Sequence, residues 1–169
     1  MSDTAVAVVT YDPDWPRKFE RERSLLEEVL APWLDGGIHH VGSTSVPGLA
    51  AKPIVDMIAG VRELDAARAA FEPLFAHGYA LEPHRPGIAH HFAKPSYSVH
   101  LTEPESDLWR ERLAFRDALR RDHALAGEYA ALKLRLAQDH ANDPAAYLAG
   151  KRAFVGRVLA DAGLTFGRR

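Results

Sequence analysis

The sequence predicts an α/β (α+β) fold in which a small mixed β-sheet is followed by a C-terminal helical subdomain. Two patterns support this prediction: short apolar runs alternate with helical periodicity in the first part of the chain, and the part after Glu105 is helical throughout. Such an order is typical of a sheet with a helical buttress. Without an internal repeat or a long linker, we expect one domain over 1–169, with a sheet-containing core in 1–104 and helices in 105–169.

Glycine and proline mark the boundaries of the elements expected in the core. Apolar residues recur at helical spacing from Trp15 to Trp33, and we expect Gly36 and Gly37 to end this helix. Pro73 should kink or divide a later helix. Short apolar runs between turn residues predict the strands. The core should therefore contain strands over 6–9, 38–41, 54–58, 79–81, 90–94 and 97–102, and helices over 15 to about 35 and about 64–76.

The C-terminal part contains start signals for further helices. Ser106 or Asp107 is expected to cap the first helix, and Pro144 falls in the first turn of the last one. We expect these helices to cover about 107–122, about 125–140 and about 143–162.

Composition excludes several classes of protein. Hydrophobic residues make up 47% of the chain and charged residues 26%, which is ordinary for a globular protein. A net charge of −2 gives no reason to expect nucleic-acid binding. The absence of cysteine excludes disulfides and cysteine zinc sites. No run is typical of a signal peptide or a membrane span, so we expect a cytoplasmic protein that does not bind membranes.

The stretch 42–58 is the most informative part of the sequence, and it begins with a turn rich in hydroxyl groups. Gly42 lets a ligand approach the backbone closely, because it has no Cβ atom. Ser43, Thr44 and Ser45 follow it, and backbone N–H groups in such a turn make a candidate anion site. A turn that only caps a short helix is the alternative.

A single carboxylate stands in the apolar strand that follows the turn. Asp56 shares one face of this strand with Ile54 and Ile58. Burying a carboxylate is costly without a partner, so we expect a cation or hydrogen-bond donors beside it. Lys52 lies just before the strand, and the sequence leaves open whether it meets a phosphate or is solvated.

Three motifs together resemble the GrpB family, which has the fold of the DNA polymerase β-like nucleotidyltransferases. They are G-S-T-S-V-P-G-L-A-A-K-P-I-V-D over 42–56, Y-D-P-D-W-P over 11–16 and F-R-D-A-L-R over 115–120. The resemblance spans nearly the whole chain. It implies a sheet of nucleotidyltransferase type and a bound nucleoside triphosphate or other small phosphorylated ligand, with Ser43 at its β- and γ-phosphates.

The resemblance also implies a metal site. Nucleotidyltransferases usually carry two carboxylates at alternate positions of this strand, and these hold a pair of Mg²⁺ ions because hard cations prefer oxygen ligands. In this chain Asp56 occupies the first position and Ile58 the alternate one. We therefore expect Asp56 to bind Mg²⁺ in a catalytic protein, while Ile58 should impair two-metal catalysis.

A histidine on a later strand is a second candidate for chemistry. GrpB-like proteins often show a His-x-His pattern there, and His100 matches its second histidine while Ser98 replaces the first. The resemblance implies that His100 is a metal ligand or a general base; a hydrogen-bonded or solvent-facing histidine is the alternative. A transition-metal site is a further alternative, with Asp56, His100 and either His40 or His90 as ligands.

The C-terminal helices carry the candidate phosphate-binding cations. Arg112, Arg116 and Arg120 lie along one helix edge, and we interpret Arg112 as solvated. Arg116 and Arg120 match family positions and are candidate phosphate clamps. Lys133 and Lys151 also match family positions, and each follows a tyrosine by four residues. Lys151 stands inside an apolar stripe, which favours a side chain that snorkels or points into an anionic cleft.

Three functions remain open at this point. The first is a nucleotidyltransferase-like protein that transfers a nucleotidyl group to an unknown acceptor. The second is a non-catalytic module that binds a nucleotide or a coenzyme, since some family members are fused to dephospho-coenzyme A kinase. The third is a phosphohydrolase that depends on a His/Asp metal site.

Overall fold

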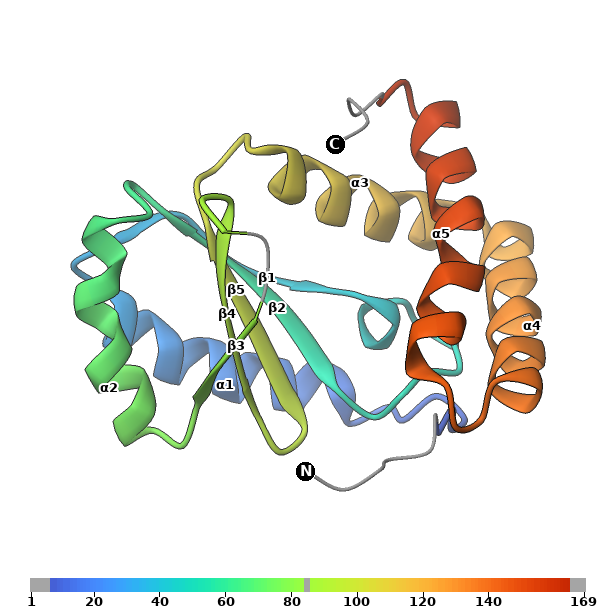
Figure 1. Cartoon of the computed structure of the whole chain (residues 1–169), viewed down its shortest axis with the longest axis horizontal. Coiled ribbons are helices and arrows are strands. Elements are labelled where there is room, and N and C mark those ends of the chain that lie inside the picture. The colour runs from blue at the N-terminus through green and yellow to red at the C-terminus, as the bar shows by residue number, and fades with distance from the viewer. Residues whose placement is uncertain (1–6, 84–85, 165–169) are drawn as a thin grey trace.

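The computed structural model describes residues 7–83 and 86–164. Within these residues, a five-stranded sheet carries helices on both faces, and two helices lie beyond one of its ends (Figure 1). The α/β (α+β) prediction is confirmed. The strands are β1 (Leu34–Val41), β2 (Val55–Val61), β3 (Ala80–Glu82), β4 (Ala89–Lys94) and β5 (Tyr97–Thr102). The helices are α1 (Trp15–Leu30), α2 (Phe71–Ala76), α3 (Asp107–Arg121), α4 (His123–Asp139) and α5 (Pro144–Asp161), with 3₁₀ turns η1 (Ser43–Ser45) and η2 (Ala66–Ala70).

The strand order is β1-β2-β5-β4-β3, and the central pair β2 and β5 is parallel while the other pairs are antiparallel. In the parallel pair, Asp56 is the register partner of Ser98, and Ile58 is the partner of His100. Because side chains alternate between the faces of a sheet, these four residues all lie on one face.

The two faces of the sheet have different partners. One face packs against α1, η2 and α2, in a core that includes Trp15, Met57 and Phe92. The other face packs against α3, where Leu108 and Trp109 meet apolar residues of the sheet. The Asp56 face is therefore the one that α3 covers.

Asp and Ser side chains cap the C-terminal helices, and Ser106, one of the two predicted caps of the first of them, is confirmed. Side chains of Ser106, Asp122 and Asp143 accept backbone hydrogen bonds at the starts of α3, α4 and α5. The helices α4 and α5 pack side by side beyond the turn that follows β1 (Figure 1). They are in tight contact at Gly150, where an added Cβ atom would stand 2.4 Å from Leu136 Cδ2. Only a residue without a side chain fits there unless a neighbour shifts.

The first helix and the first strand differ from the prediction. Helix α1 ends at Leu30, and Gly36 and Gly37 lie inside β1, where the register to β2 shifts. The physical reason is Pro32, which has no N–H group to continue the helical hydrogen bonds, although Ala31 still has helical backbone angles. The predicted strand over 6–9 lies partly outside the described residues, and its end forms an isolated bridge from Val9 to Ala51.

The predicted helix over about 64–76 is divided before Phe71, into η2 and α2. This division places Pro73 in the first turn of α2, where its missing N–H group costs no helical hydrogen bond. In the part of the chain that the structure describes, no helix has the length and apolar character to cross a membrane.

Candidate functional site

The turn after β1 is built around Asp56. Val41, the last residue of β1, is the register partner of Asp56, and Gly42 follows with a φ of 72°. A Cβ atom on Gly42 would stand 2.6 Å from Asp56 Oδ2. Glycine at this position therefore makes room for the carboxylate and also meets a backbone angle that other residues resist.

The three hydroxyl groups of the turn have different roles. Ser45 Oγ donates to the Gly42 carbonyl at 2.5 Å, and Thr44 Oγ1 donates to the Ile54 carbonyl at 3.0 Å. Both hydroxyls therefore stabilise the turn itself. Ser43 instead lines a cavity and hydrogen-bonds with Tyr129 of α4.

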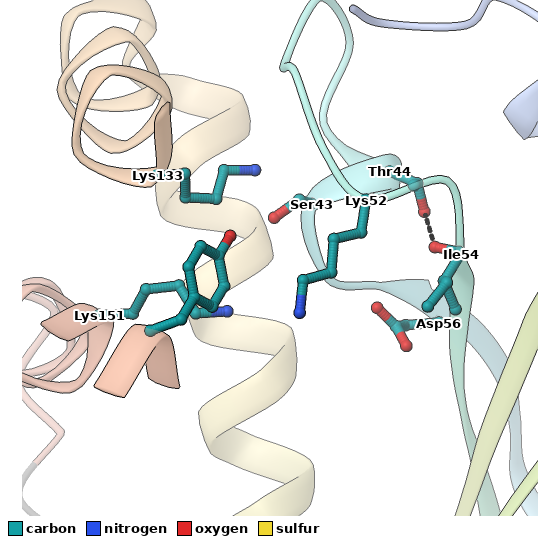
Figure 2. Close-up of a pocket in the computed structure, with 8 residues that line it drawn as sticks. Ser43, Thr44, Lys52, Ile54, Asp56, Lys133 and Lys151 are labelled. Carbon is teal, nitrogen blue, oxygen red and sulfur yellow. Dashed lines mark hydrogen bonds between the residues drawn. The ribbon is translucent and has the colours of Figure 1, made fainter. Parts of the chain in front are cut away.

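A small polar cavity of about 70 Å³ lies between the turn, β2 and the helices α4 and α5. Figure 2 shows Lys133 and Lys151 reaching toward it from one side, while Lys52 and Asp56 approach from the other. Lysines are few in this chain, and three of its five meet here from segments far apart in the sequence. The complete lining consists of Ser43, Thr44, Lys52, Ile54, Asp56, Lys133, Tyr147 and Lys151.

Aromatic rings hold the three amines in place. The Nζ atoms of Lys52 and Lys151 lie 4.5 Å and 4.7 Å from the centre of the Tyr147 ring. Lys133 Nζ lies 4.9 Å from the centre of the Tyr129 ring and donates to the Ala50 carbonyl. An ammonium group over a ring face is stabilised by the ring quadrupole, so the tyrosines partly replace the water that the amines lose.

The positive charges of the three amines destabilise one another. Burial lowers the pKa of Lys133 to about 7, with a further contribution from the charges of Lys151 and Lys52. Burial and Lys52 lower the pKa of Lys151 to about 8, although Asp56 opposes this shift. The pKa of Lys52 is also lowered by burial. A bound anion would relieve this repulsion.

Asp56 is the carboxylate at the centre of these charges. Its burial raises its pKa, while Arg112, Lys151, a hydrogen bond from Ser98 and Lys52 oppose the rise, in that order. Arg112 is the residue that the sequence reasoning missed, because it had been interpreted as solvated. Its Nε atom is buried and has no hydrogen-bond partner among the described residues.

Arg116 and Arg120 are both engaged with the protein backbone. Arg116 donates to the His40 carbonyl at 3.2 Å and pairs with Asp117, and Arg120 Nε donates to the Ser45 carbonyl at 2.9 Å. They connect α3 to the two ends of the turn. Their predicted role as phosphate clamps stays a prediction, and their present hydrogen bonds are structural.

The histidines separate onto two faces. His100 lies on the Asp56 face, where its ring stacks on that of His91 at 4.1 Å, and His91 Nε2 lies 2.9 Å from Ser98 Oγ. His40 stacks on Phe19 of α1 on the opposite face. His90 also lies on that opposite face, next to His91 in β4.

The sequence alternative of a transition-metal site with His40 or His90 as a ligand stays a prediction, and the strand register places both histidines on the face opposite Asp56. His40 is the register partner of Met57 rather than of Asp56, so its side chain points away from the carboxylate. No group of three or more His, Asp or Glu side chains suited to a metal occurs within 7–83 and 86–164.

A pair of Mg²⁺ ions does not fit the donor set at Asp56. Ile58, at the alternate strand position, is fully buried in an apolar cluster with Leu108 and Trp109. The described lining of the cavity offers three amines and one carboxylate, whereas hard cations need several oxygen ligands. Binding of a single Mg²⁺ at Asp56, and a metal role for His100, stay predictions.

The class of fold is shared with enzymes that transfer nucleotides. A solved cytoplasmic RNA terminal U-transferase superposes with a TM-score of 0.51 at 14% identity, over 80% of this chain and 41% of that chain. A likeness at this identity shows the fold alone. It supports the expected sheet of nucleotidyltransferase type.

The chain belongs to the GrpB family, whose model, described as GrpB protein, matches residues 5–161. The glutamate-rich protein GrpB of Alkalihalophilus pseudofirmus is 34% identical over 164 residues, 91% of this chain and 94% of that protein. The YqkA protein of Bacillus subtilis is 36% identical over 156 residues, 89% of this chain but 45% of that protein. The solved conserved protein GrpB from Enterococcus faecalis superposes with a TM-score of 0.85 at 31% identity, over 92% of this chain and 96% of that chain.

Proposed function

We propose that this chain is a nucleotidyltransferase-like protein that binds a nucleoside triphosphate or another small phosphorylated molecule in the cavity beside Asp56. The observation that supports it is the meeting of Lys52, Lys133 and Lys151 at one small cavity. Gathering buried like charges costs stability, and such a cost is typical of a site kept for a ligand of opposite charge.

The fuller form of this proposal is nucleotidyl transfer. An acceptor hydroxyl oxygen would form a bond to the α-phosphorus, pyrophosphate would leave, and a base would take the hydroxyl proton. In this scheme the lysines stabilise charge on the phosphates, and His100, on the same face as Asp56, is the proposed base. The nucleotidyltransferase-like fold supports this form.

A non-catalytic binding module is the second candidate, and the burial of Ile58 supports it. A carboxylate at this position would have to replace a fully buried side chain in an apolar cluster. The fold would then retain a phosphate site without the pair of carboxylates that two-metal catalysis uses.

Thermal unfolding with a panel of nucleotides and coenzyme A species, with and without Mg²⁺, tests the proposal, because a ligand of the folded state raises Tm. We expect a nucleotide to raise Tm in the wild type and in Lys18→Met, a control on α1 that does not line the cavity, but not in Lys151→Met. Pyrophosphate release that disappears in Asp56→Asn would support transfer. Binding without turnover would support the module, and no shift with any phosphorylated compound would contradict both.

A further inference from the structure

We propose that the cavity takes a single phosphate monoester group as its dianion, held by lysine ammonium groups rather than by a metal ion. This inference rests on the proposed function and narrows it to one ligand class: small molecules that end in a phosphate monoester and bind without a metal. Three observations carry it, namely the size of the cavity, its charge and its donor set.

The size of the cavity matches one phosphate group. Its volume is about 70 Å³, several times the space that one buried water molecule needs. A tetrahedral group of a few heavy atoms fits such a space. In this arrangement the terminal phosphate of a larger ligand occupies the cavity, and the rest of that ligand lies outside it.

The charge of the lining matches a dianion. Lys52, Lys133 and Lys151 bring three positive charges when protonated, and Asp56 brings one negative charge, which leaves a surplus of two. A phosphate monoester carries a charge near −2 at neutral pH. The monoester therefore neutralises the charge of the lining by itself. A divalent cation added to the same cavity would restore a surplus of two positive charges.

The donor set favours phosphate over a metal ion. Ammonium groups donate hydrogen bonds to phosphate oxygens and cannot ligate a metal while charged. They come from a loop, from α4 and from α5, so they surround the cavity from different directions. The strand position that would supply a second carboxylate is Ile58, buried under Trp109.

Isothermal titration calorimetry with adenosine, AMP, ADP, ATP and inorganic phosphate, each in EDTA and in excess Mg²⁺, tests this inference. We expect AMP to bind in EDTA, with less than about a threefold change in Kd on adding Mg²⁺ or further phosphates, and adenosine not to bind. Lys52→Met, on a loop where the change should not unfold the chain, should weaken AMP binding by roughly 10- to 100-fold. Lys18→Met is the matched control and should leave Kd unchanged.

The outcomes separate this inference from the proposal on which it rests. Binding of ATP that needs Mg²⁺, without binding of AMP or phosphate, would leave the proposed function standing and overturn the single-monoester site. An equal loss of AMP binding in Lys18→Met would overturn the assignment of the cavity. No binding by any of the five probes would overturn both.

Discussion

Two groups of cations on the C-terminal helices differ in how they use their hydrogen-bond donors. Arg116 and Arg120 of α3 donate to backbone carbonyls at the two ends of the turn. Lys133 and Lys151 of α4 and α5 instead hold their ammonium groups over tyrosine rings at the cavity. The arginines thus join two segments of the chain, while the lysines lie next to other positive charges.

The difference separates cations that stabilise the fold from cations that, under the proposed function, are kept for a ligand. A guanidinium bonded to a carbonyl gains a charge-assisted hydrogen bond on folding. A buried ammonium near two others loses hydration and is repelled, which is visible in the lowered pKa of Lys133. Mutations in the two groups should therefore change stability in opposite directions.

The largest expected effect is in the first group. Arg116→Met should lower the free energy of unfolding by about 2 kcal/mol, because it removes the charge-assisted bond to the His40 carbonyl. Urea unfolding measures this loss. Arg110→Met is the control, since Arg110 is exposed and pairs only with Asp107 of its own helix among the described residues. If both variants lost the same free energy of unfolding, the bond from Arg116 to the His40 carbonyl would not stabilise the fold.

Removing a charge from the second group should raise the free energy of unfolding instead of lowering it. Lys133→Met should raise the free energy of unfolding at neutral pH by roughly 1–2 kcal/mol, because a buried charge is replaced by an apolar side chain of similar length. The same variant should lose phosphate binding. Urea unfolding beside Lys18→Met measures the gain, and a variant less stable than the wild type would show that the bond to the Ala50 carbonyl outweighs the repulsion.

The gain in Lys133→Met should depend on pH. The pKa of Lys133 is about 7 in the folded protein and 10.5 in its ordinary state, so between these values the unfolded chain binds more protons. The wild type therefore gains stability as pH rises through this window, and Lys133→Met lacks this contribution. The difference between the two proteins should shrink from pH 7 to pH 10, as measured by urea unfolding at several pH values. A constant difference would mean that Lys133 titrates normally.

Mutation of Arg112 should have the smallest effect on stability. The size of this effect shows whether Arg112 belongs with the structural arginines or with the cavity lysines. Arg112→Met should change the free energy of unfolding by less than about 1 kcal/mol, because its buried Nε has no hydrogen bond to lose among the described residues. Phosphate affinity should still fall several-fold, since a charge beside Asp56 is removed. A loss of stability as large as that of Arg116→Met would place Arg112 with the structural arginines.

Local patterns in the sequence could predict the strands and the face that Asp56 shares with Ile58, because both follow from the period of a strand. The apolar stripe around Lys151 likewise indicated a lysine with an unusual position, and the structure places it at the cavity. The same reasoning applied to Arg112 would have found it. It lies four residues after Leu108 and three before Phe115, inside the apolar stripe of α3 that packs against the rest of the protein.

Other features depend on contacts between distant segments. The carbonyl groups that Arg116 and Arg120 bind are more than seventy residues away, and no helical pattern indicates them. The sequence shows that neighbouring histidines point to opposite faces, but only the register with β2 decides that His40 leaves the Asp56 face. The functional roles of the site residues stay predictions.

Gly150 has no chemistry of its own, yet it sets the spacing of the two helices that carry the cavity lysines. Leu136, which it contacts, follows Lys133 by three residues, and Gly150 itself directly precedes Lys151. A single methyl group at this position would push the two amines apart without changing any charge. Under the proposed function, selectivity for ligand size would therefore depend on a residue that does not line the cavity.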